Sequence, residues 1–196
     1  TGETRIDLQD APLVFVGYGV SAPERNWDDF KGMDLKGKVA LILVNDPDFE
    51  TGEGAFGGKA MTYYGRWTYK YEEMARRGAA GALVIHETEP AAYGWLTVKN
   101  SNTNEAFDVL REDPKSQHVP VQGWIQRDAT VEIMRKAGLD LDELKARAQK
   151  PDFQPVVLDG VTFSTRFDVK KDQVVSRNIV GVLPGEPGVE GCLSEV

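Results

Sequence analysis

The most regular feature of the chain is a set of short, uninterrupted apolar runs. They cover residues 13–16, 39–44 and 82–85, and they stop at a glycine, at Asn45 and at His86. Runs without polar interruption are typical of strands that are buried on both faces. We therefore predict three buried strands, of which 39–44 gives the strongest signal.

A helical pattern fills the interval between the second and third of these strands. Tyr71, Met74 and Ala75 repeat on one helical face, and charged residues occupy the opposite face. Gly78 suits the left-handed conformation that commonly ends a helix. A strand, a helix and a strand at this spacing predict a βαβ crossover with the two strands parallel.

Two further helices are predicted in the second half of the chain. Asp128 is expected to cap a helix that ends at Gly138, and Asp140 is expected to cap the next one. The apolar stripe of this second helix consists of Leu141, Leu144 and Ala148.

The remaining segments are predicted as strands or long loops. Strands are expected at 119–121, at 161–169, where apolar and polar residues alternate, and at 178–183. Residues 49–66 and 87–117 lack periodicity and are expected to form loops. Loops of this length usually serve a function or an interface.

Composition narrows the class of partner. The chain has 196 residues and a formal net charge of -8. Phosphate binding requires clustered Lys and Arg. The negative net charge therefore argues against nucleic acid and anionic membrane surfaces as partners. No apolar run approaches the roughly 20 residues that span a bilayer. The single cysteine, Cys192, excludes a disulfide within the chain and a Cys-based zinc site.

Candidate metal ligands are few. His86, Glu87 and Glu89 offer an imidazole and two carboxylates, and we interpret them as a strand end that enters a polar loop. His118 is interpreted as a loop residue. Residues 46–50 place carboxylates at alternate positions but do not follow the EF-hand spacing. We interpret them as a solvated acidic loop, with an irregular calcium site as the alternative.

Aromatic residues and arginine gather in and beside the two long loops. Tyr64, Arg66 and Trp67 lie at the end of the first loop, and Trp95 lies in the second. These residue types are enriched in binding hot spots. Tyr71 is interpreted as a core residue instead, because it lies on the apolar helix face. We predict Tyr64, Arg66, Trp67 and Trp95 as binding residues, and assign no catalytic residue and no metal ligand to this chain.

Five segments, taken in order, resemble one family. They are FVGYG at residues 15–19, DLKGKV at 34–39, KYEEMARRGAAGA at 70–82, VPV at 119–121 and SRNIVG at 176–181. Each motif is weak alone, but the ordered set is similar to the protease-associated domain inserted in M28-type zinc aminopeptidases. The resemblance covers residues 11–185.

The resemblance implies a β-rich α+β fold, an open barrel-like sheet with flanking helices. It implies a lead-in at residues 1–10, the domain at 11–185 and a linker or tail at 186–196, with the peptidase core absent from this sequence. In the family the zinc ions belong to that core, so no cofactor is expected in this chain. The implied location is secreted or periplasmic.

The implied function is accessory. Such a domain covers the peptidase cleft and shapes the access of peptide substrates, so its partners are the catalytic domain and the peptide. By resemblance, Arg66, Trp67 and Trp95 fall in loops that face the cleft. Two alternatives stay open: an autonomous peptide- or protein-binding module of the same type, and a small metal-dependent enzyme that uses His86 with Glu87 or Glu89.

Overall fold

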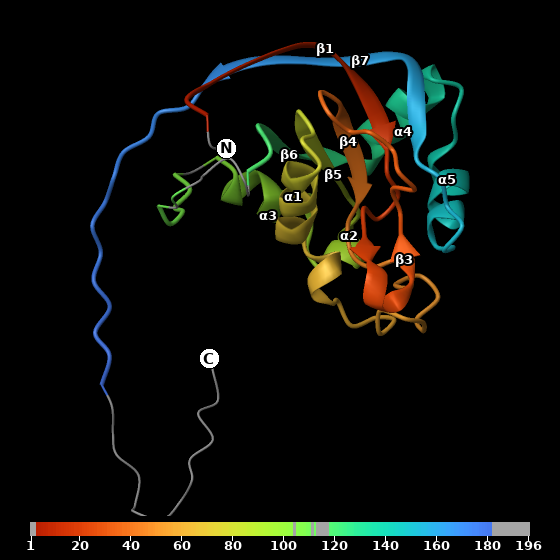
Figure 1. Cartoon of the computed structure of the whole chain (residues 1–196), viewed down its shortest axis with the longest axis horizontal. Helices are drawn as coiled ribbons and strands as arrows, with labels where there is room; N and C mark the ends of the chain where they lie inside the picture. Colours follow the sequence, from red (N-terminus) through yellow and green to blue (C-terminus); the bar gives the residue numbers. More distant parts are fainter. Residues whose placement is uncertain (1–2, 104, 111, 113–117, 182–196) are drawn as a thin grey trace, which may run out of the picture.

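Five strands form one curled sheet in this computed structural model, which describes residues 3–103, 105–110, 112 and 118–181 (Figure 1). The strands are β1 (Arg5–Phe15), β4 (Val39–Leu43), β5 (Gly81–His86), β6 (Val121–Gln126) and β7 (Val156–Asp168). Their order across the sheet is β6-β5-β4-β1-β7. The architecture is therefore α+β with a half-barrel sheet, as the sequence predicts at this level.

The sheet is parallel except at one edge. β1, β4, β5 and β6 run in the same direction, and β7 pairs antiparallel with β1. The β1–β7 register shifts between Leu8 and Ala11 and again between Pro12 and Val14. Such irregularities bend a strand and increase its twist, which fits the curl of the sheet at this edge. The paired ends of β1 and β7 extend beyond the other strands (Figure 1).

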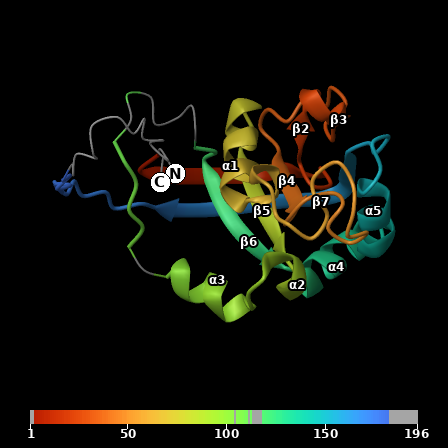
Figure 2. The ribbon, with the colours of Figure 1, turned by 90° about the horizontal axis from the view of Figure 1, so that it is seen from below.

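Short elements connect the strands. A small ribbon of β2 (Ser21–Ala22) and β3 (Trp27–Asp28), with η1 (Pro23–Arg25) between them, follows β1. The helices are η2 (Tyr63–Gly65), α1 (Trp67–Arg76), α2 (Thr88–Ala91), α3 (Trp95–Ser101), α4 (Arg127–Lys136) and α5 (Leu141–Ala148). Figure 2 shows the same elements from below, with β6 at the edge of the sheet next to β5.

The core lies on both faces of the sheet. Every residue of β4 is buried, and its side chains alternate between the faces. Leu41 packs in the cluster that contains Met134 of α4, and Ile42 packs in the cluster that contains Met74 of α1. The sheet is therefore a middle layer, and its loops are held by helices from both sides.

Several local predictions are confirmed. The βαβ unit forms with β4 and β5 parallel, and α1 is followed by Gly78 in the left-handed region (φ 66). The Asp140 carboxylate caps α5 by accepting a hydrogen bond from the Glu143 backbone N–H at 2.9 Å. Tyr71 is buried in the core, as its place on the apolar helix face predicts.

Three predictions are wrong. The segment 87–117 is not one irregular loop, because α2 and α3 form within its described part. Asp128 is not the cap of α4, which begins at Arg127, but it lies in the first turn, where a carboxylate still favours the helix dipole. No strand forms over residues 178–181, which have no neighbouring strand in the described chain and where Ile179 is 99% exposed.

The expected domain limits fall partly outside the described residues. β1 begins at Arg5, so part of the expected lead-in 1–10 belongs to this strand. The expected tail 186–196 and Cys192 lie outside the described residues, as do residues 182 and 183 of the expected last strand.

The turn after β1 depends on glycine. Gly17 has a φ of +59, and a Cβ there would lie 2.9 Å from Phe153 Cε1 and 3.1 Å from Ala148 Cβ. Gly138 has a φ of +72, but nothing lies within 4 Å of its Cβ position. The two positions therefore share the backbone strain and differ in packing.

We predict that Gly17→Ala costs more stability than Gly138→Ala. The Gly138 variant should lose about 1 kcal/mol from left-handed strain alone. The Gly17 variant should lose roughly 2–4 kcal/mol, because overpacking adds to the strain. Urea denaturation of the two variants and the wild type measures both values, and equal losses would contradict the packing seen around Gly17.

Candidate functional site

The candidate site lies at one edge of the sheet, where the carboxyl ends of the parallel strands meet. The segment that follows β4 and the segment that follows β5 both leave from this edge, because β4 and β5 are parallel neighbours. In open sheets of parallel strands, ligands bind outside the carboxyl ends of the strands. The residues predicted for binding come from these two segments and from the start of α1.

A buried lysine fixes this edge. Lys70 of α1 has 0% exposure, and its ammonium donates hydrogen bonds to the backbone carbonyl of Tyr18, at 2.5 Å, and to that of Asn45, at 3.0 Å. The first carbonyl belongs to the turn after β1 and the second to the segment after β4. A single side chain thus ties α1 to two turns at the carboxyl end of the sheet.

Two buried aspartates hold the loops around this lysine. The Asp29 carboxylate accepts hydrogen bonds from the Val20 backbone N–H, at 2.9 Å, and from the Trp27 indole N–H, at 2.7 Å. The Asp46 carboxylate accepts from the backbone N–H of Thr62, at 2.6 Å, and from its hydroxyl, at 2.8 Å. Asp46 thereby closes the long loop that follows β4 by binding the residue that precedes η2.

Burial shifts the titration of this group. Burial raises the pKa of Asp29 to about 7, although its hydrogen bonds with Val20 and Trp27 and the charge of Lys70 oppose the shift. Burial also lowers the pKa of Lys70 to about 8, against the attraction of Asp46 and Asp29. The pKa of Asp46 is raised by burial as well. Each shift has the sign that desolvation of a charged group produces.

The acidic loop is buried rather than solvated. Asp46 has 0% exposure and Asp48 has 8%, which corrects the interpretation of residues 46–50 as a solvated loop. The Asp48 carboxylate accepts a hydrogen bond from the Phe56 backbone N–H at 2.7 Å. Both aspartates accept hydrogen bonds from backbone amides, and Asp48 keeps one buried oxygen, Oδ1, without a hydrogen-bond partner.

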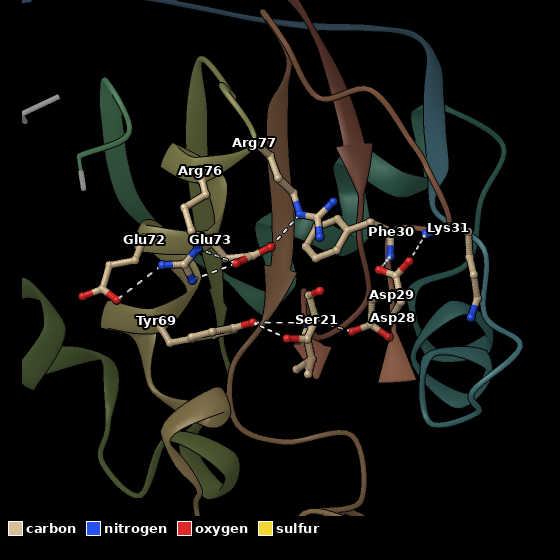
Figure 3. A network of polar contacts seen from close by, with 11 residues as sticks. Ser21, Asp28, Asp29, Phe30, Lys31, Tyr69, Glu72, Glu73, Arg76 and Arg77 are labelled. Carbon is tan, nitrogen blue, oxygen red and sulfur yellow. Dashed lines mark hydrogen bonds and ion pairs between the residues drawn. The ribbon is translucent and has the colours of Figure 1, made fainter. Parts of the chain in front are cut away.

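A polar network between α1 and the segment 21–31 supports the same region (Figure 3). The Tyr69 hydroxyl accepts a hydrogen bond from the Ser21 backbone N–H at 3.1 Å. Glu73 binds Arg76 and Arg77 at 2.7 Å each. The Arg77 guanidinium lies 3.5 Å from the centre of the Phe30 ring, a cation–π contact. These contacts join α1 to the ribbon after β1.

Tyr64 lies in an aromatic cluster with Phe56 and Tyr69. Its ring centre is 5.9 Å from that of Phe56 and 5.0 Å from that of Tyr69. The Arg25 guanidinium lies over Phe56 and Tyr64, and the Tyr64 hydroxyl donates a hydrogen bond to Glu24 at 2.8 Å. Tyr64 thus anchors the end of the long loop to η1.

Trp67 and Trp95 lie in two further sets of rings, Trp67 with Tyr71 and Trp95 with His86. Both sets border the same core cluster, so we call them together the aromatic arc. Its members are Trp67, Tyr71, His86, Tyr93, Trp95 and Trp124. Trp67 is 44% exposed, and its ring centre is 5.7 Å from that of Tyr71, whose hydroxyl donates a hydrogen bond to the Gly123 carbonyl of β6 at 2.9 Å.

His86 is the centre of the other set of rings. Its ring centre lies 5.5 Å from that of Trp95 and 6.1 Å from those of Tyr93 and Trp124. Tyr93 and Trp124 are also in contact, at 6.3 Å. The structure therefore brings Trp95 and Trp67 to one face of β5 and β6, while Tyr64 belongs to the separate cluster.

Arg66 lies between the two groups. It is the cap residue of α1, and its side chain is exposed. Within the described ranges, the Arg66 guanidinium has no ion-pair or hydrogen-bond partner. The side chain is thus available to an anionic group of a ligand.

The histidine and glutamates of the sequence hypothesis do not converge on a metal. His86 Nε2 lies 2.9 Å from the Tyr93 carbonyl oxygen, and Glu87 pairs with Lys145 at 2.8 Å and with Arg127 at 3.4 Å. In the part of the chain that the structure describes, no group of three or more His, Cys, Asp or Glu residues is placed to hold a metal ion. These donors do not fit a zinc site.

The second histidine is also occupied by protein contacts. His118 Nε2 lies 2.7 Å from the Asp108 carboxylate, and its Nδ1 lies 3.3 Å from the Gln122 amide nitrogen. His118 therefore ties the segment before β6 to β6 itself.

Sequence reasoning missed Lys70. A signal existed, because Lys70 stands four residues before Met74 and so falls on the apolar stripe of the predicted helix. A lysine on a core-facing stripe needs acceptors inside the protein. The identity of those acceptors, two backbone carbonyls from distant turns, depends on the tertiary fold and cannot be read from spacing.

Comparison with known proteins gives no relative. No family model matches the chain, and no curated protein or solved structure matches it. Among the helices of the described residues, none is long and apolar enough to cross a membrane.

We predict that Asp29 makes stability fall as pH rises from about 4 to about 7. The folded protein holds the Asp29 proton more tightly than the unfolded chain, whose pKa is near 3.8, so this contribution is complete below pH 3.8 and is lost as pH approaches 7. Asp29→Asn should flatten this decline, while Asp152→Asn, at an exposed position in the turn before β7, should leave it unchanged. Urea denaturation across this pH range tests the difference, and parallel curves for wild type and Asp29→Asn would contradict it.

Proposed function

We propose that this chain is a protease-associated domain that serves as a non-catalytic accessory domain of an M28-type zinc aminopeptidase. In this role it covers the peptidase cleft and limits access to peptide-sized substrates. The observation that carries the proposal is the aromatic arc, whose exposed end presents Trp67 at the carboxyl edge of a braced sheet. The ordered motifs of the sequence supply the family.

A rigid surface favours ligand binding, because little conformational freedom is lost when the ligand binds. Lys70 fixes the two turns of this edge, and the Tyr71 hydroxyl fixes α1 to β6. Side chains held in place lose little conformational entropy when a peptide binds. Trp67 and Trp95 then contact apolar side chains of the peptide, and Arg66 pairs with a carboxylate. Tyr64 contributes by holding the loop that leads to Arg66.

The proposal assigns the catalytic zinc ions to a separate peptidase domain. The partners of this chain are then that domain and the peptide, and the location is secreted or periplasmic. A second candidate is an autonomous peptide-binding module of the same family. It is favoured by the fact that the whole aromatic arc belongs to this chain, so that no second domain is needed to complete it.

We predict that the purified chain binds peptides without cleaving them. A panel of aminoacyl and dipeptide chromogenic substrates, with and without added zinc, should show no turnover above buffer. Zinc-dependent turnover that survives repurification and is lost in His86→Ala would overturn the accessory role and support the small-enzyme alternative.

Peptide binding should depend on the rings of Trp67 and Trp95. Titration of the chain with the free tripeptide Leu-Tyr-Leu, followed by NMR chemical shifts, should show an affinity that Trp67→Ala and Trp95→Ala each weaken about tenfold. Phe167→Ala is the matched control, because Phe167 is exposed on the distant β1–β7 ribbon. Equal effects of all three variants would show that the rings do not form the binding surface.

A further inference from the structure

The strand β6 is an edge strand with an unpaired outer side. In the sheet order its one neighbour is β5, and the two strands pair in parallel from Val121 with Gly81 to Gln126 with His86. The position of β6 at the edge can be followed in Figure 2. Backbone groups on such an edge form a template for another extended chain.

The register shows which backbone groups face outward. The Val121 N–H donates to the Ala80 carbonyl at 3.2 Å, so Val121 directs its backbone groups toward β5. In a parallel ladder this direction alternates along the strand, so Gly123 also faces β5, whereas Gln122 and Trp124 face outward. Within the described part of the chain, the N–H and C=O groups of Gln122 and Trp124 have no hydrogen-bond partner.

The composition of β6 leaves this edge open. Its sequence is VQGWIQ, which contains no charged residue and no proline. Natural edge strands are usually protected by lysine, proline or a bulge. The absence of these features within β6 is what a strand that accepts a partner strand requires.

The aromatic arc lies directly beside this edge. Trp124 packs with the cluster on the α1 face of the sheet, and Tyr71 on the same face reaches the Gly123 carbonyl. Trp67 lies on the ring of Tyr71. A chain added next to β6 would direct every second side chain toward this face, because side chains alternate along a strand.

We propose that an extended peptide binds this protein as a sixth strand, paired with the outer edge of β6. The backbone groups of Gln122 and Trp124 hold the peptide main chain, and Trp67 and Trp124 select apolar side chains at alternate positions. This inference rests on the proposed function and names its substrate class, a peptide that binds in an extended conformation. Main-chain pairing gives affinity, and alternate side chains give specificity.

The test uses the whole chain and a probe of defined chemistry, the blocked hexapeptide Ac-Val-Thr-Phe-Thr-Val-Thr-NH2. Two N-methylated versions are compared with it, one methylated at the odd residues and one at the even residues. An added strand directs alternate N–H groups toward β6, so one version should bind about tenfold weaker or worse, and the other nearly as well as the parent peptide.

Variants of Gln122 test the same main-chain pairing by changing the protein instead of the peptide. Gln122→Pro removes an outward N–H without removing a β6–β5 hydrogen bond, a position where proline is tolerated on an edge strand. Gln122→Ala is the control, because it loses the same side-chain contact with His118 and keeps the N–H. We expect Gln122→Pro to weaken peptide binding about tenfold and Gln122→Ala to leave it unchanged. Thermal unfolding of both variants reports whether the fold is kept.

Hydrogen exchange locates the bound peptide. The amides of Gln122 and Trp124 should exchange about tenfold more slowly in the complex. Equal binding of both N-methylated peptides, no binding of the parent peptide, or unchanged exchange at these two amides would each overturn the inference. Sedimentation that shows a dimer, which Gln122→Pro converts to a monomer, would assign the edge to a second copy instead.

These outcomes separate the two proposals. Peptide binding that depends on Trp67 and Trp95 but not on Gln122→Pro would remove the sixth strand and leave the accessory function. Zinc-dependent cleavage by the chain alone would remove the accessory function, whatever the exchange at β6 shows.

Discussion

The arrangement of the whole site depends on one buried ammonium group. Lys70 is fully enclosed, and a lysine in the interior is unfavourable unless its donors are satisfied. Here the acceptors are carbonyls from the turn after β1 and from the segment after β4, with the charges of Asp29 and Asp46 close enough to act on the lysine pKa. The cost of burying the charge is thus offset only when α1, both turns and both aspartates are assembled together.

Three consecutive residues of α1 form hydrogen bonds with three different parts of the chain. Tyr69 binds the backbone of Ser21 in the ribbon after β1, Lys70 binds the two turns, and Tyr71 binds Gly123 in β6. Helical residues that follow one another point in different directions around the axis, so one turn of helix reaches three separate segments. The exposed ring of Trp67 and the outer edge of β6 are positioned by the same turn. A ligand-binding surface that is positioned by this turn of α1 can be rigid, although loops form part of the surface.

Part of this structure follows from local sequence. The uninterrupted apolar run at 39–44 predicts the central strand, because burial on both faces leaves no room for polar residues. The apolar stripe with Gly78 predicts α1 and its end. The Asp140 cap is local too, since donor and acceptor are three residues apart. The cap predicted at Asp128 was wrong, because α4 begins at Arg127 with Gln126 as its cap.

The rest depends on contacts between distant segments. We interpreted the acidic residues 46–50 as a solvated loop because carboxylates are usually exposed to solvent. Asp46 is buried instead, by a loop that returns to it at Thr62. The strand expected at 178–183 has the right composition, but a strand needs a partner, and the described chain provides none for 178–181. The binding prediction grouped Tyr64 with Trp67 and Trp95, whereas the fold separates Tyr64 from them, which spacing along the chain cannot reveal.

The measurement that tests the role of Lys70 most directly is the free energy of unfolding of Lys70→Met at pH 7, compared with Lys136→Met at an exposed position of α4. Methionine keeps the length of the side chain and removes the donors, which leaves the carbonyls of Tyr18 and Asn45 unpaired. We predict a loss of roughly 3–5 kcal/mol for Lys70→Met and less than about 0.5 kcal/mol for Lys136→Met. A Lys70→Met protein as stable as the wild type would contradict it, because the turns of this edge would then be held by packing alone.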